Sequence, residues 1–361
     1  MHGGAYLRSI WPAEYLAYRG ISATVGLSWP EPDDGTEVVI IHRPIAEDSV
    51  RRVERLQRAG MRVLVQEDDD LSRIHQTLNP VQGWAHRVAP IHDEAMRRAD
   101  GIIVSTPRLV EVYGGLNQNV WLCPNALPAW VSACRWYWSQ MKAQQSLRVG
   151  WQGVVDSHLH DIEWIKPVMR KLTKGAIFTT IGEGPILARH FGVPVVAHEH
   201  RPFAYRMLDM YRWMSRADVG IVPLVPNGFN EAKSSLKALE YMTVGVPVVA
   251  TDLPEQRALI DHGVDGFLAS SPEEFADRVQ DLLHDEELRF SFSEAARAKT
   301  LDLLIEKTGS CWEDAVLGRD RITTMQVRRA DGGTGRRVRS QAPKSGVPPQ
   351  VGGIREAAGH Q

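Results

Sequence analysis

Residues 230–252 read NEAKSSLKALEYMTVGVPVVATD, a polar loop that leads into a helix and then into a buried strand. Ser234 and Ser235 are typical N-cap residues, and a helix that starts there directs its unpaired backbone N–H groups and positive dipole end at the loop. Gly245 ends this helix, and the valine-rich run at 246–249 predicts a strand buried on both faces. The arrangement is typical of a phosphate-binding site.

Charged side chains favour the same interpretation. Lys233, Lys237 and Glu240 are spaced i, i+4 and i+7, so they share one helix face. Two lysines at this spacing repel each other unless an anion lies between them. The alternative is an ordinary surface helix with solvated lysines and a Lys237–Glu240 pair. In the phosphate-site interpretation we expect Glu240 to be a half-exposed carboxylate in a cleft.

Composition limits the class of protein. The chain has 361 residues, enough for two domains, and its formal charge of −2 argues against a dedicated nucleic-acid binder. The 3 cysteines are widely spaced, which favours a reducing compartment such as the cytoplasm. No run of 18 or more apolar residues is present, so we expect a soluble protein, with peripheral membrane contact left open.

Strand-length apolar runs alternate with helix-length amphipathic stretches, which predicts the α/β class. The expected strands are 37–42, 62–66, 101–105, 119–122, 147–151, 176–180, 193–196, 219–223 and 266–269. The expected helices are 46–59, one after Thr106 and Pro107, 159–172, and one with a capping box at Ser271. We expect two Rossmann-like domains facing across a cleft, at 1–125 and 147–315, with a Trp-rich linker at 126–146 and a disordered tail at 324–361.

Two segments resemble a known family. Residues 217–270, ADVGIVPLVPNGFNEAKSSLKALEYMTVGVPVVATDLPEQRALIDHGVDGFLAS, resemble the donor-site region of glycosyltransferase family 4, which has the GT-B fold. Residues 147–165, LRVGWQGVVDSHLHDIEWI, are similar to the opening strand and turn of that family's C-terminal domain. Over 1–125 the resemblance is looser.

The resemblance implies a retaining, hexosyltransferase-type enzyme that uses a nucleotide-sugar donor and needs no further cofactor or obligatory metal. Glu240 matches the glutamate that holds the ribose, and Ser235 and Leu236 match positions whose backbone N–H groups bind the diphosphate. The donor-binding residues implied are Lys233, Ser234, Ser235, Leu236, Lys237, Glu240, Gly153 and His158, and the acceptor-side candidates are Tyr6, Arg8, Asp69 and Asp70. No catalytic acid or base is assigned.

The sequence departs from the family pattern in three places. The glutamate that normally touches the donor sugar falls on Ala232. The basic residues after the first C-terminal strand are replaced by Trp151, Gln152 and the stretch 157–160, where His158 either faces the diphosphate or, like Ser157, caps a helix. The family's first strand is missing ahead of Tyr6, for which we expect a start site assigned too late.

Three consecutive aspartates, Asp68 to Asp70, end a predicted strand and have two interpretations. Such carboxylates can hold Mg²⁺ with a diphosphate, or they can cap a helix and contact an acceptor hydroxyl, which we favour. Two other functions stay open beside the transferase: a nucleotide-sugar epimerase and a non-catalytic or degenerate GT-B scaffold. The acceptor, whether glycan, lipid, protein or small molecule, is not determined by the sequence.

Overall fold

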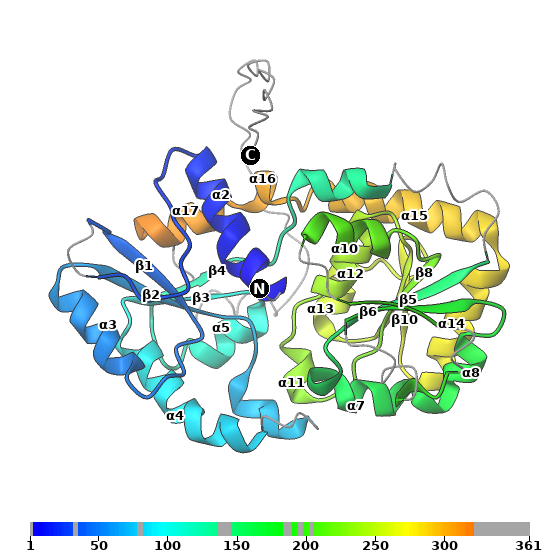
Figure 1. Ribbon diagram of the computed structural model, residues 1–361, viewed down its shortest axis with the longest axis horizontal. Helices are drawn as coiled ribbons and strands as arrows, with labels where there is room; N and C mark the ends of the chain where they lie inside the picture. The colour runs from blue at the N-terminus through cyan, green and yellow to red at the C-terminus, as the bar shows by residue number, and fades with distance from the viewer. Residues whose placement is uncertain are drawn as a thin grey trace, which may run out of the picture.

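The computed structural model describes residues 3–31, 35–77, 82–135, 146–182, 190–193, 198–202 and 206–320. The expected tail at 324–361, part of the linker and most of the expected strand at 193–196 lie outside these ranges. Figure 1 shows two α/β domains side by side, each built on its own sheet. Within the described residues, no helix is both long and apolar enough to cross a bilayer.

The N-terminal domain contains a parallel sheet in the order β1-β2-β3-β4. Its strands are β1 (Val38–His42), β2 (Arg62–Glu67), β3 (Gly101–Val104) and β4 (Val120–Leu122), and its main helices are α3 (Ser49–Arg58), α4 (Gln82–Arg98) and α5 (Pro107–Tyr113). Strands β2 and β3 are almost fully buried, as in a parallel sheet covered on both faces, and the buried residues at the end of β2 are the polar Gln66 and Glu67. The expected cap is confirmed, since the Thr106 hydroxyl accepts a hydrogen bond from the Leu109 N–H at 3.3 Å.

Short helical segments complete this domain. They are α1 (Gly3–Ala5), the π-helix η1 (Tyr6–Ile10), α2 (Trp11–Tyr18) and the 3-10 segments η2 (Leu71–Gln76) and η3 (Ala129–Ala133). The described residues before β1 therefore contribute helices and no strand to the sheet. Trp11 and Leu16 of α2 are buried in the main hydrophobic cluster, so the N-terminal segment is part of the core.

The C-terminal domain contains a parallel sheet in the order β10-β9-β8-β5-β6-β7. Its strands are β5 (Arg148–Gly153), β6 (Ile177–Gly182), β7 (His198–Pro202), β8 (Val219–Val222), β9 (Val248–Thr251) and β10 (Gly266–Ala269). The helices are α7 (Val155–Ile165), the 3-10 segment η4 (Lys166–Val168), α8 (Met169–Leu172), α10 (Met207–Met214), α11 (Gly228–Glu231), α12 (Leu236–Thr243), α13 (Pro254–Leu259), α14 (Pro272–His284), α15 (Glu286–Thr300), α16 (Ile305–Thr308) and α17 (Ser310–Leu317).

One helix prediction is wrong in its boundaries. The expected helix at 159–172 begins earlier, at Val155, and is interrupted at η4 before α8. Pro167 lies in η4 and lacks a backbone N–H, so the α-helical hydrogen bonding cannot continue through it. The capping box at Ser271 is confirmed in part: Ser271 Oγ accepts from the Glu274 N–H at 3.2 Å, but the Glu274 carboxylate accepts from Ser270.

The C-terminal sheet reverses its strand order at β5. From β5 the chain proceeds outward to β6 and β7, and then returns to place β8 on the opposite side of β5. Ligands of such sheets bind outside the carboxyl ends of the strands at this reversal. The loop after β5 and the loop between β8 and α12 meet there. Gly153 and residues 223–235 therefore lie at the edge of the sheet where a ligand is expected.

The last helices return to the N-terminal domain, where α17 lies against α2 and β4 (Figure 1). Tyr15 donates a hydrogen bond to Glu313 at 2.7 Å, and the Trp121 indole N–H donates to the Arg319 carbonyl at 2.6 Å. The stretch predicted as one C-terminal unit, 147–315, therefore includes helices that help to cover the N-terminal sheet.

Candidate functional site

The amino end of α12 lies at the reversal of the C-terminal sheet. The helix begins at Leu236 with Ser235 as the N-cap residue, as predicted, but no side chain caps it. The five residues 233–237 are all partly exposed. Gly245 adopts a left-handed conformation with φ of 75° where the helix ends, as the sequence predicts. The exposed, uncapped helix start leaves its backbone N–H groups available to an anion.

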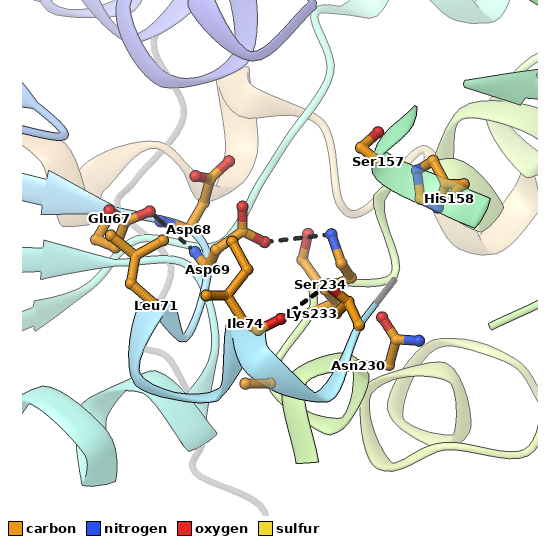
Figure 2. Close-up of polar contacts among 12 residues, drawn as sticks. Glu67, Asp68, Asp69, Leu71, Ile74, Ser157, His158, Asn230, Lys233 and Ser234 are labelled. Atoms are coloured by element: carbon orange, nitrogen blue, oxygen red, sulfur yellow. Dashed lines mark hydrogen bonds and ion pairs between the residues drawn. The ribbon is translucent and has the colours of Figure 1, made fainter. Parts of the chain in front are cut away.

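Lys233 points toward the N-terminal domain. Its Nζ lies 3.2 Å from Asp69 Oδ1, the interdomain ion pair drawn in Figure 2, and 4.8 Å from the centroid of the Phe229 ring. Burial alone would lower the pKa of Lys233, but Asp69 and Asp161 outweigh that effect and raise it. Lys233 is therefore a charged ammonium held by a carboxylate.

Lys237 has a different environment. Its Nζ lies 2.5 Å from His158 Nε2 and 5.9 Å from the centroid of the Trp151 ring. Burial and the nearby Lys233 lower the pKa of Lys237 to about 7. The Lys237–Glu240 pair of the alternative interpretation is not among the ion pairs of the described residues, because Lys237 turns toward α7.

His158 lies on α7, on the opposite side of Lys233 from the N-terminal domain (Figure 2). Its Nδ1 lies 2.7 Å from Asp161 Oδ2, and burial together with Lys237 lowers its pKa to about 4. The suggestion that Ser157 or His158 caps this helix is wrong: the N-cap is Val154, and Ser157 Oγ donates to the Val154 carbonyl. His158 contacts Lys237 of α12 instead, and its expected place at the diphosphate stays a prediction.

Glu240 is buried rather than half exposed, with 3% of its surface accessible. Its two carboxylate oxygens accept hydrogen bonds from Gln152 Nε2 at 2.7 Å and from the Tyr211 hydroxyl at 2.9 Å. Burial raises the pKa of Glu240 to about 7. The expectation of a half-exposed carboxylate is wrong because α10 brings Tyr211 over this part of α12, which the local sequence does not reveal.

Ala232, which stands where the family has a glutamate, is buried between the two domains. Ala232 is fully buried in a hydrophobic cluster of the N-terminal domain that includes Val65 and Ile102. Its carbonyl accepts a hydrogen bond from Thr106 Oγ1 at 3.0 Å. A side chain longer than alanine has no space here, so the alanine follows from the packing between the domains.

The N-terminal side of the site is an acidic cluster, consisting of Glu67, Asp68 and Asp69 together with Arg43. One Arg43 nitrogen, Nη2, lies 2.6, 2.8 and 2.9 Å from oxygens of the three carboxylates in turn. Burial alone would raise the pKa of Glu67, but Arg43 and His92 hold it well below its usual range. Ligand atoms of the three carboxylates lie within 4.8 Å of one another, but the guanidinium stands where a metal ion would have to bind.

Comparison with known proteins decides the class. Residues 147–285 match the family model described as glycosyl transferases group 1. The chain is a GT-B glycosyltransferase. No curated protein matches its sequence.

Solved structures show the same fold as this transferase. Sucrose-phosphate synthase from Thermosynechococcus elongatus is 15% identical, with 89% of this chain and 77% of that chain covered and a TM-score of 0.58. Anabaena HepE in complex with UDP-glucose is 13% identical, covering 78% and 79%, with a TM-score of 0.58. The pneumococcal O-GlcNAc transferase GtfA in complex with UDP and GlcNAc is 15% identical, covering 78% and 57%, with a TM-score of 0.56.

Several predicted site residues of the transferase are internal. Arg8 is 1% exposed, donates to the Cys123 carbonyl at 2.7 Å and stacks on Trp312, and Tyr6 packs against Trp11. Asp70 is fully buried and caps η2 by accepting from the Ser72 N–H. Of the four acceptor-side candidates, Asp69 is the one whose carboxylate reaches the other domain.

Gly153 ends strand β5 in a crowded position. A Cβ atom there would lie 2.9 Å from the Trp151 ring and 3.1 Å from His158. The glycine therefore allows Trp151 and His158 to approach the backbone, and its expected role in donor binding stays a prediction.

Hydrogen bonds join the two domains around this site. Asn125 Nδ2 donates to Ser234 Oγ at 2.8 Å, and the Gln76 carbonyl lies 3.1 Å from His160 Nδ1. Phe229 of α11 packs with Leu71 and Ile74 of η2. The loop that precedes α12 thus contacts both domains at once.

Sequence reasoning missed Arg43, Asp161, Gln152 as a partner of Glu240, and Tyr211. Each acts through a partner distant in sequence, so no local pattern marks it. The signal that could have been used is position: Arg43 follows strand β1 directly, as Asp68 follows β2, and parallel strands end at the same edge.

Proposed function

We propose that this glycosyltransferase transfers a sugar from a nucleotide-sugar donor to an acceptor with retention of configuration at the anomeric carbon. The observation that carries the proposal is the amino end of α12, where two ammonium groups and an uncapped helix start are partly exposed at one place. A diphosphate supplies the anion that this arrangement lacks.

The donor would be held in two parts. The diphosphate accepts hydrogen bonds from the backbone N–H groups at Ser235 and Leu236 and faces Lys233 and Lys237. Glu240 is 3% exposed without a ligand, so the ribose would have to displace part of its cover; each carboxylate oxygen keeps a lone pair for a ribose hydroxyl after bonding Gln152 and Tyr211. The UDP-glucose of Anabaena HepE and the UDP of pneumococcal GtfA support a uridine nucleotide as the first donor to test.

The chemistry follows from where charge develops. Breaking the bond between the sugar and the diphosphate leaves negative charge on the departing oxygen, while the sugar becomes oxocarbenium-like. The ammonium groups and the helix end stabilise the departing charge without donating a proton. Retention is supported by the resemblance of residues 217–270 to retaining enzymes.

The test is calorimetry of the full chain with UDP and GDP, with uridine and guanosine as controls that lack the phosphates. We expect a nucleoside diphosphate to bind at least about tenfold more tightly than its nucleoside, since charge-assisted hydrogen bonds contribute about 1.5–3 kcal/mol. Equal affinities would refute the phosphate site.

A second measurement tests the reaction itself. Incubation with a panel of nucleotide-sugars, followed by NMR of the released or transferred sugar, gives the anomeric configuration of the first-formed product. An α-linked donor should yield an α product. A β product would contradict retention while leaving the donor site intact.

A further inference from the structure

We propose that Asp161 and His158 are positioning residues that hold the Lys237 ammonium at the diphosphate-binding end of α12. The proposal rests on the proposed function, because it assigns Lys237 to the donor diphosphate. Neither residue is expected to touch the reacting atoms, so both act through Lys237.

Hydrogen bonds fix the orientation of Asp161. Its Oδ1 accepts two hydrogen bonds, from the Val225 backbone N–H and from Asn230 Nδ2, both at 2.8 Å. The side chain is 4% exposed, so these bonds fix it in a dry environment. Its Oδ2 is left to contact His158 Nδ1 at 2.7 Å.

The contact with Asp161 decides which ring nitrogen of His158 carries the hydrogen. An ionised carboxylate is an acceptor only, so His158 must carry its hydrogen on Nδ1. The lone pair of Nε2 then faces Lys237 Nζ at 2.5 Å and accepts a hydrogen from the ammonium. The low pKa of His158, caused by burial and by Lys237, keeps the ring neutral in this role.

Lys237 contacts no counter-ion directly in the part of the chain that the structure describes. Among the described residues, no carboxylate oxygen lies within 4.0 Å of the Lys237 nitrogen, although Asp161, Glu240, Asp69 and Lys233 all act on it electrostatically. A neutral imidazole fixes the position of Lys237 without supplying a counter-charge, and an anion bound there would favour the ammonium form, whose pKa is about 7 without one. The two other N–H groups of Lys237 are then available to an anion.

The geometry also explains the departure from the family sequence. The basic residues expected after the first C-terminal strand are absent, and His158 stands in that region. In the structure the cation is Lys237 of α12, and His158 contacts it. His158 thus supports the charge that the family pattern places directly on this segment.

The experiment is a double-mutant cycle in the full chain, measured by calorimetry with UDP and uridine, or with GDP and guanosine if only guanine nucleotides bind. His158→Leu should weaken nucleoside diphosphate binding about tenfold and leave nucleoside binding unchanged. His158→Gln should restore most of the affinity, because its amide oxygen can accept from Lys237. Asp161→Asn should give an intermediate loss.

The deciding variant combines His158→Leu with Lys237→Met. We expect it to bind no more weakly than Lys237→Met alone, because His158 acts through the lysine. Additive losses, or equal losses for diphosphate and nucleoside, would overturn the proposal. His284→Leu, at an exposed histidine on α14, is the matched control and should change nothing.

A measurement without ligand separates this proposal from the proposed function. Nitrogen NMR of the His158 ring should show the neutral Nδ1–H tautomer from about pH 6 to pH 8, and Asp161→Asn should introduce the other tautomer. An Nε2–H ring in the unmutated protein would refute the positioning role. If no nucleotide binds, the proposed function fails, and the ring spectrum still decides whether the Asp161–His158–Lys237 chain exists.

Discussion

The acidic cluster of the N-terminal domain and the lysines at the amino end of α12 face each other across the domain boundary, but their charges have different kinds of partner. Glu67, Asp68 and Asp69 share the single guanidinium of Arg43. Lys237, in contrast, is bonded to a neutral imidazole. A buried charge without a counter-ion is costly unless a ligand supplies one.

This difference distinguishes charges that stabilise the fold from charges that are available to bind a ligand. Arg43 balances only part of the charge of the acidic cluster, and Lys233 of the other domain pairs with Asp69, so the cluster holds the ends of β1 and β2 together. Of the two lysines at the amino end of α12, Lys233 is paired with Asp69, and Lys237 is paired with no carboxylate among the described residues. An anion can therefore bind there.

The largest effect is expected for Arg43→Ala. Breaking a buried ion pair by removing one partner costs about 3–5 kcal/mol of folding free energy, because the remaining carboxylates lose their counter-charge. Arg43 has a φ of 50°, and alanine would bear the same backbone strain, so the change reports the lost contacts. Chemical denaturation measures it, with exposed Arg52→Ala as the control expected to cost less than about 1 kcal/mol.

The next effect is expected for Glu240→Ala. This variant leaves the buried Tyr211 hydroxyl and Gln152 amide without their acceptor, which costs about 1–3 kcal/mol of folding stability. Thermal and urea unfolding at one pH measure the change. An unchanged free energy of unfolding would show that Glu240 serves the ligand alone and contributes nothing to packing.

The pH dependence of stability follows from the same residue. Because the pKa of Glu240 is raised to about 7 in the folded protein, its protonated form is favoured by folding. Its stabilising contribution is full below the ordinary value of 4.5 and is lost as pH rises through about 7. Glu240→Gln should therefore remove a fall in stability across that window, at most about 1.4 kcal/mol per pH unit.

A smaller effect separates the two lysines. We expect Lys237→Met to weaken nucleoside diphosphate binding about tenfold and Lys233→Met only about threefold, because a phosphate must compete with Asp69 for Lys233. Calorimetry of both variants measures the ratio. Exposed Lys166→Met, which removes a pair with Glu163, is the control. A larger loss at Lys233 would reverse the assignment of structural and functional charge.

The smallest effect is a gain of affinity. Asp69→Asn removes the carboxylate that competes for Lys233, so nucleoside diphosphate should bind about threefold more tightly. The nucleoside alone should bind unchanged. Weaker diphosphate binding in this variant would mean that Asp69 orients Lys233 rather than competing for it.

Local rules predicted the elements around α12 well. The helix start at Ser235 and the stop at Gly245 follow from capping and are confirmed, and the buried strand predicted at 246–249 lies two residues later, at Val248–Thr251. The burial of Glu240 and of Ala232 was not predictable, because Tyr211 and the N-terminal cluster reach them from distant parts of the chain. His158 was recognised, whereas its partner Asp161, one turn later on the same helix, was not.

The burial of Phe229 and Ala232 also decides how the enzyme can be divided into pieces. Both residues are joined by sequence to the C-terminal domain but lie in hydrophobic clusters with residues of the N-terminal domain. A fragment of residues 146–320 would expose them to water, together with the face of α17 that covers β4. Contacts between the two domains therefore stabilise both of them, and a fragment of either half would lose these contacts.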